Sequence, residues 1–161
     1  MSLKSQVRDL IEQGKLDELT DLTCEEPKAL RYVVAMTYRP EPELHAAACR
    51  GVAMASRHDP ELVEQTVRRL VWAMNDESGT NALSAPGVIL AIAKENPQLL
   101  IPMIPDLTRL SADEGLRDRL VEALELITEA YPGSAGRQIQ QSLNKKFADQ
   151  RKRRNKLKRR M

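Results

Sequence analysis

Residues Pro97–Tyr131 read PQLLIPMIPDLTRLSADEGLRDRLVEALELITEAY, and their apolar pattern indicates the fold class. Apolar residues recur three and four positions apart in its second half, which places them on one face of a helix: Leu116, Leu120, Ala123, Leu124 and Ile127. Pro97 suits the first position of a preceding helix, because the first N–H groups of a helix have no intrahelical acceptor. The stretch therefore predicts two consecutive helices.

The same pattern returns along the chain at a regular interval. Pro27, Pro60, Pro97 and Pro132 lie 33, 37 and 35 residues apart. The third and seventh residues after each proline are apolar: Leu30 and Val34, Val63 and Val67, Leu100 and Ile104, Ala135 and Ile139. Other amphipathic stretches predict helices over residues 42–57, 61–74, 83–95 and 114–131. A period of this length that holds two helices is typical of a stacked helical repeat.

These residues resemble the HEAT-repeat family. Leu107–Leu110, Asp113 and Leu116-Arg117 are similar to its pattern of a helix, an Asp in the turn and a Leu-Arg pair that opens a second helix. Residues 70–93 resemble a copy without the Arg, and residues 29–55 a copy without the Asp and the Arg. The block 68–86 also resembles small prokaryotic HEAT-like proteins. The resemblance implies an all-α fold, a short right-handed α–α superhelix of the HEAT/armadillo solenoid type, and it implies no catalytic chemistry.

The two ends of the chain flank this repeat. Residues 2–13 and 16–22 predict short helices, the first ended by Gly14, that cap the stack within residues 1–24. Residues 134–149 predict a final helix. We expect one helical domain over residues 1–147 and a basic tail over residues 148–161.

Charge divides the chain into the same two parts. Residues 1–144 hold 15 Lys and Arg against 22 Asp and Glu, a net charge of −7, whereas residues 145–161 hold ten against one, a net charge of +9. Such asymmetry indicates an interaction tail on an acidic body. We expect the acidic body to offer no basic groove for a duplex, which argues against a DNA-repair enzyme that resembles the HEAT-like alkylpurine glycosylases.

Composition also limits the fold class and the cellular compartment of the protein. Only 3% of the residues are aromatic and helix formers dominate, which argues against a β-sandwich or barrel. No apolar run reaches the ~20 residues that span a bilayer, so no membrane partner is expected. Two cysteines without a paired motif, Cys24 and Cys49, predict free thiols in a reducing compartment, and hence a cytoplasmic protein.

The sequence contains no nucleotide-binding, nucleophile or metalloprotease motif. His45 and Cys49 lie four residues apart on a predicted helix, with Glu41 one turn earlier, a spacing that permits a metal site or a thiol–imidazole pair. Packing of the small Cys49 side chain in an Ala-rich helix is favoured over either. We expect no catalytic residue, no metal and no cofactor.

A candidate partner-binding patch lies on the polar side of the predicted helix 61–74. Trp72 is about 180° from Val63 around this helix and shares its face with Arg68, Arg69 and Asp76. An exposed tryptophan beside arginines has the composition of an interface hot spot, and Arg68 would stack on the indole. The alternative is that a neighbouring repeat covers Trp72. In the HEAT resemblance the helices led by proline form the outer layer, which puts this patch outside the concave groove.

Two charged segments complete the candidates. One face of the predicted helix 114–131 carries Asp118, Glu122, Glu125 and Glu129, which is either an ordinary solvated face or a site for a cationic partner. The tail carries Arg151, Lys152, Arg153, Arg154, Lys156, Lys158, Arg159 and Arg160. Such a run binds phosphates with strong salt dependence and little sequence preference, or serves as a solubilising extension.

The sequence favours a non-enzymatic protein-binding or scaffold module of the HEAT-repeat type. The alternative function is a nucleic-acid-associated protein that the basic tail anchors to phosphates. In both cases we expect a macromolecular partner, protein or polyanion, and no small-molecule cofactor.

Overall fold

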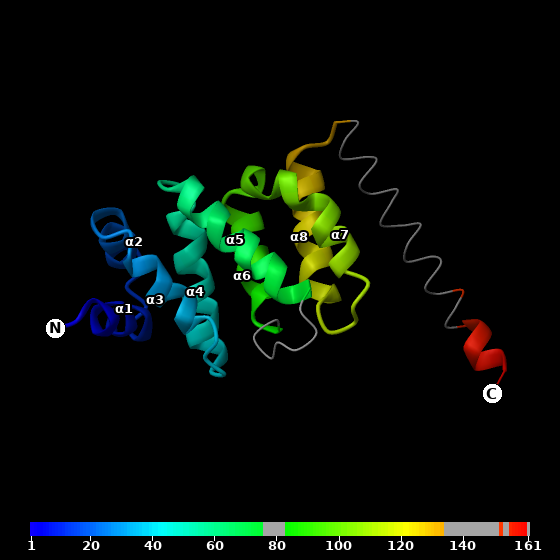
Figure 1. Ribbon diagram of the computed structural model, residues 1–161, viewed down its shortest axis with the longest axis horizontal. Helices are drawn as coiled ribbons and strands as arrows, with labels where there is room; N and C mark the ends of the chain where they lie inside the picture. The colour runs from blue at the N-terminus through cyan, green and yellow to red at the C-terminus, as the bar shows by residue number, and fades with distance from the viewer. Residues whose placement is uncertain (76–82, 134–151, 153–154, 161) are drawn as a thin grey trace.

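The computed structural model describes residues 1–75, 83–133, 152 and 155–160. Within these residues the chain is helical and contains no β-strand. The main elements, labelled as in Figure 1, are α1 (Leu3–Glu12), α2 (Leu16–Glu25), α3 (Ala29–Met36), α4 (Pro42–Ala55), α5 (Pro60–Asn75), α6 (Ala85–Glu95), η2 (Pro97–Met103), α7 (Ile104–Leu110) and α8 (Arg117–Ala130). The prediction of an all-α protein is confirmed.

The helices pack in sequence order along the long axis of the molecule (Figure 1). Each even-numbered helix contacts the next, so that α2 packs on α4, α4 on α6 and α6 on α8. The odd-numbered helices cover them, with α3 on α4, α5 on α6 and α7 on α8. Helices that are close in sequence are therefore close in space.

Polar contacts join corresponding ends of neighbouring helices. Asn96, at the end of α6, donates its side-chain N–H to the carbonyl of Ser56, at the end of α4, over 3.1 Å. Arg57 and Glu95 form an ion pair of 3.2 Å at the same place. Since both helices end here, α4 and α6 run in the same direction.

The core consists of the faces that the apolar pattern predicts. The stripe of α8 is buried throughout, and Leu30, Val63, Val67 and Leu100 are buried as expected. Gly51 lets α4 approach its neighbours, because a Cβ there would lie 2.9 Å from Leu19 and 3.1 Å from Val33.

Arg117 donates to the carbonyl oxygens of Ser111 and Ala112, which have no partner within α7. Arg117, which belongs to the Leu116-Arg117 pair of the HEAT resemblance, thus links the start of α8 to the end of α7.

One predicted helix differs from the expectation. The helix led by Pro97 divides into the 3-10 helix η2 and the short α7, because Pro102 and Pro105 lack the N–H groups that a continuous α-helix would bond. Other boundaries shift by up to three residues; α8, for example, begins at Arg117 and not at residue 114. The expected helix over residues 134–149 lies outside the described residues. No helix in the described part of the chain is long and apolar enough to cross a membrane.

Candidate binding surfaces

Trp72 lies exposed on α5, with 71% of its surface accessible to solvent. The opposite side of α5 faces the core through Val63, Val67, Leu70, Val71 and Met74. The alternative prediction, that a neighbouring repeat covers the indole, is therefore wrong. A large apolar side chain left in water by an otherwise well-packed helix marks a candidate contact surface.

The two arginines near Trp72 are arranged differently from the prediction. Arg68 donates to Glu64 over 2.8 Å, one turn toward the start of α5, so it forms an ion pair instead of stacking on the indole. The cation–π contact found among the described residues is that of Arg31 over Tyr32, at 5.4 Å. Arg69 is exposed. Asp76, the fourth predicted member, lies outside the described residues.

The predicted acidic face of α8 is accessible. Asp118, Glu122, Glu125 and Glu129 are all exposed, and no ion pair to them is found in the described part of the chain. A row of carboxylates that lack ion pairs within the described residues is compatible with either prediction, an ordinary solvated face or a site for a cationic partner.

The described residues of the basic tail are exposed as well. These are Lys152 and residues 155–160, of which 155–159 form a helical turn. None of them forms an ion pair with the acidic face of α8 within the described residues. Arg151, Arg153 and Arg154 lie outside the described part.

His45 and Cys49 lie together on α4, but their surroundings oppose nucleophilic chemistry. His45 Nδ1 donates to the carbonyl of Thr37 over 2.6 Å, and His45 Nε2 accepts from Arg119 Nη1 over 3.1 Å. The ring is therefore neutral, and the nitrogen 3.6 Å from Cys49 Sγ already has a donor. Burial raises the pKa of the Cys49 thiol to about 12, and the charge of Arg119 offsets only part of this effect. Glu41 pairs with Arg39 instead of approaching His45.

The bond between His45 and Arg119 spans α6, which lies between α4 and α8. It passes over Gly87, where a Cβ would lie 2.5 Å from His45 Nε2 and 2.7 Å from Arg119 Nη1. A Cβ at this position would therefore displace one of the two side chains.

A groove of about 320 Å³ lies beside this bond, between α4, α6 and α8. We call it the cationic groove, since its lining includes Arg50, Lys94 and Arg119 around a floor of Leu90 and Ala91. None of the three cations forms an ion pair among the described residues. A groove of this size is too small for a duplex, so the expectation that the acidic body offers no basic groove for a duplex stays a prediction. Packing gathers here cations that are 44 and 25 residues apart in the chain.

Sequence reasoning missed this groove for a physical reason. Arg50, Lys94 and Arg119 do not fall at one repeated position relative to the prolines, and each lies on a helix whose neighbours in sequence are mixed in charge. The sequence offered one sign of the groove, Gly87, since a glycine inside a predicted helix marks a close approach by another group.

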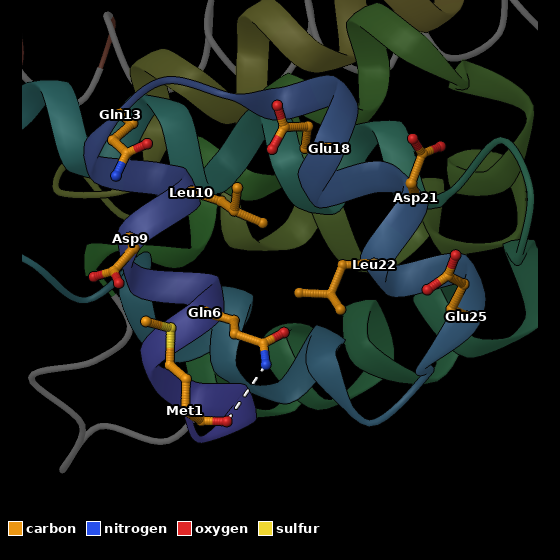
Figure 2. Close-up of a pocket in the computed structure, with 9 residues that line it drawn as sticks. All are labelled: Met1, Gln6, Asp9, Leu10, Gln13, Glu18, Asp21, Leu22 and Glu25. Carbon is orange, nitrogen blue, oxygen red and sulfur yellow. Dashed lines mark hydrogen bonds between the residues drawn. The ribbon is translucent and has the colours of Figure 1, made fainter.

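A second groove, of about 410 Å³, lies between α1 and α2 (Figure 2). Leu10 and Leu22 point into it from the two helices, and acidic side chains surround it. We call it the acidic groove, because its lining contains four carboxylates and no basic residue: Asp9, Glu18, Asp21 and Glu25.

The described residues hold no group of three or more His, Cys, Asp or Glu side chains that would bind a metal ion. Comparisons with family models, with curated proteins and with solved structures find no match to this chain.

Proposed function

We propose that this chain is a non-enzymatic protein-binding module, built as a short right-handed stack of HEAT-like helical pairs. The stacking is supported by the contact of each even-numbered helix with the next and by the shared direction of α4 and α6. A second ordered contact, from Arg109 of α7 to Asn75 of α5 over 2.6 Å, joins the ends of two helices in the other layer. Stacks of this kind present extended surfaces to partners.

The exposure of Trp72 carries the proposal of protein binding. Burying an indole against a partner removes a large apolar area from water, and tryptophan is enriched among residues that dominate interface energies. The ion pair of Arg68 with Glu64 leaves the indole uncovered on that side, and Arg69 adds a nearby charge for the rim of an interface.

Affinity purification from the native host, quantified by mass spectrometry, tests this proposal. The wild-type chain is compared with Trp72→Ala and with Tyr38→Ala, a control that removes another exposed aromatic side chain. We expect Trp72→Ala to reduce recovery of specific partners at least tenfold, because hot-spot substitutions cost about 2 kcal/mol or more. Tyr38→Ala should retain them, and both variants should melt close to the wild type. Equal recovery with Trp72→Ala would contradict the proposal.

The exposed tail supports the second candidate, attachment to nucleic acid through phosphates. Cations that reach phosphates release condensed counterions, so affinity for an oligonucleotide should fall steeply with salt. We expect a variant ending at residue 147 to fold normally and to lose this binding. Oligonucleotide binding that survives removal of the tail would exclude the tail as the anchor.

A further inference from the structure

We infer that the cationic groove is a binding site for an acidic peptide segment of a protein partner, held through its carboxylates by Arg50, Lys94 and Arg119. This site is separate from the Trp72 surface, and the inference stands whether or not Trp72 is an anchor. It rests on the composition of the groove, on the absence of internal carboxylate partners for its cations among the described residues, and on the way in which Arg119 is held.

The three cations gather against the charge of the rest of the body. Residues 1–144 carry a net charge of −7, yet one groove is lined by three cations from three helices. Glu95, the one carboxylate among its lining residues, pairs with Arg57 at 3.2 Å. Elsewhere in the described body Arg39, Arg68 and Arg109 pair with carboxylates, whereas no ion pair is found to the three groove cations. The groove therefore keeps a positive potential that an anion would neutralise.

Arg119 is positioned without being neutralised. Its guanidinium donates one N–H to the neutral ring of His45, which in turn is fixed by Thr37, and keeps its full charge. A guanidinium has five N–H groups in a rigid fork, so four remain for a carboxylate, which it binds through two parallel hydrogen bonds. An arginine held in place beforehand loses less conformational entropy when a ligand binds.

The remaining lining favours a peptide over a nucleic acid. Leu90 and Ala91 are half-buried and form an apolar floor, which suits the side chains between two carboxylates. A volume of about 320 Å³ admits a few side chains. The lining contains no Trp, Tyr or Phe on which successive bases would stack.

Residue-resolved NMR on the full chain tests this site. The probe is a blocked hexapeptide of Glu and Leu, and its counterpart with Gln in place of Glu is the negative control. We expect the acidic peptide to shift the amide signals of Ala46, Gly87 and Ala91, and the Gln peptide to leave them in place. Shifts confined to the basic tail would overturn the inference. A short oligo(dT) forms a third arm, and groove shifts with oligo(dT) in the absence of shifts with the peptide would also overturn it.

Two double variants of equal charge separate the groove from the general charge of the protein. Arg50→Gln with Lys94→Gln removes two groove cations, and Lys28→Gln with Arg31→Gln removes two exposed cations at α3. All four residues are exposed, so both variants should fold. We expect the groove variant to weaken peptide binding about five- to tenfold and the α3 variant less than twofold, in line with two exposed ion pairs. Equal weakening would show that net charge alone attracts the peptide.

Discussion

The acidic groove and the cationic groove are built from the same kind of element, amphipathic helices side by side, yet they present opposite charges. The acidic groove lies between α1 and α2, the first two helices of the chain, and its leucines are half-buried. The cationic groove is lined by residues of α4, α6 and α8, and two of these, Leu90 and Arg119, adjoin the fully buried Ile89 and Leu120 in the sequence. The charge that a helical groove presents therefore depends on a few local side chains, because charges beyond a Debye length of about 8 Å are screened.

The two cysteines give the largest contrast between the two regions. Cys24 is exposed on α2, whereas Cys49 is buried against His45 in the cationic groove. With a pKa of about 12, Cys49 holds about a thousandfold less thiolate at pH 8 than an ordinary thiol. We expect a chromogenic disulfide reagent to modify Cys24 rapidly and Cys49 at least a hundredfold more slowly. Equal rates would mean that the cationic groove opens readily to solvent.

The same thiol predicts a dependence of stability on alkaline pH. Burial favours the protonated thiol, so the folded state binds this proton more tightly than the unfolded state. The resulting stability is complete below the ordinary thiol pKa of about 8.5 and is lost as the pH rises toward about 12. Urea unfolding at pH 8 and pH 10.5 should show a smaller loss of stability for Cys49→Ala than for the wild type. Identical losses would refute this contribution.

Substitution of a leucine in each of the two regions should lower the free energy of unfolding by different amounts. Leu120→Ala, next to Arg119 on α8, removes a fully buried side chain and should lower the free energy of unfolding by about 3 kcal/mol. Leu10→Ala removes a half-buried leucine of the acidic groove and should cost about 1 kcal/mol. Denaturant unfolding measures both values. A cost for Leu10→Ala as large as that for Leu120→Ala would show that the half-buried Leu10 is packed as firmly as a fully buried core leucine.

A smaller effect is expected at Gly87. An added Cβ would displace the His45 ring or the Arg119 guanidinium, since it would lie within 2.7 Å of both. We expect Gly87→Ala to weaken binding of the acidic peptide about threefold and to change stability by less than about 1 kcal/mol, because alanine favours the helix while the two side chains shift. Gly115→Ala, where an added Cβ meets only ordinary contacts, is the control. Wild-type affinity in Gly87→Ala would show that the bond to His45 does not position Arg119.

The helices and their buried faces were predictable, because the spacing of apolar residues in one helix determines which side is buried. Leu120 and Leu124 illustrate this, and so does Val67 on α5. The break between η2 and α7 was also readable in principle, since Pro102 and Pro105 stand in the sequence. The sequence did not determine whether Trp72 is exposed, because its exposure depends on whether another helix covers that side of α5.

The cationic groove could not be predicted, because it exists only where packing unites three separate helices. Arg119 and His45 are 74 residues apart, and no local pattern places one beside the other. The acidic face of α8 was predictable as a row of four carboxylates, since i, i+4 spacing alone defines it.

Reversing the charge of the cationic groove tests whether local charge determines which peptide binds there. Arg50→Glu with Lys94→Glu changes two exposed side chains, and NMR titration with the Glu/Leu peptide and a matching Lys/Leu peptide reads out both preferences. We predict that the variant loses the groove shifts caused by the acidic peptide and gains shifts of Ala46 and Ala91 with the basic one. An unchanged preference for the acidic peptide at these amides would contradict it.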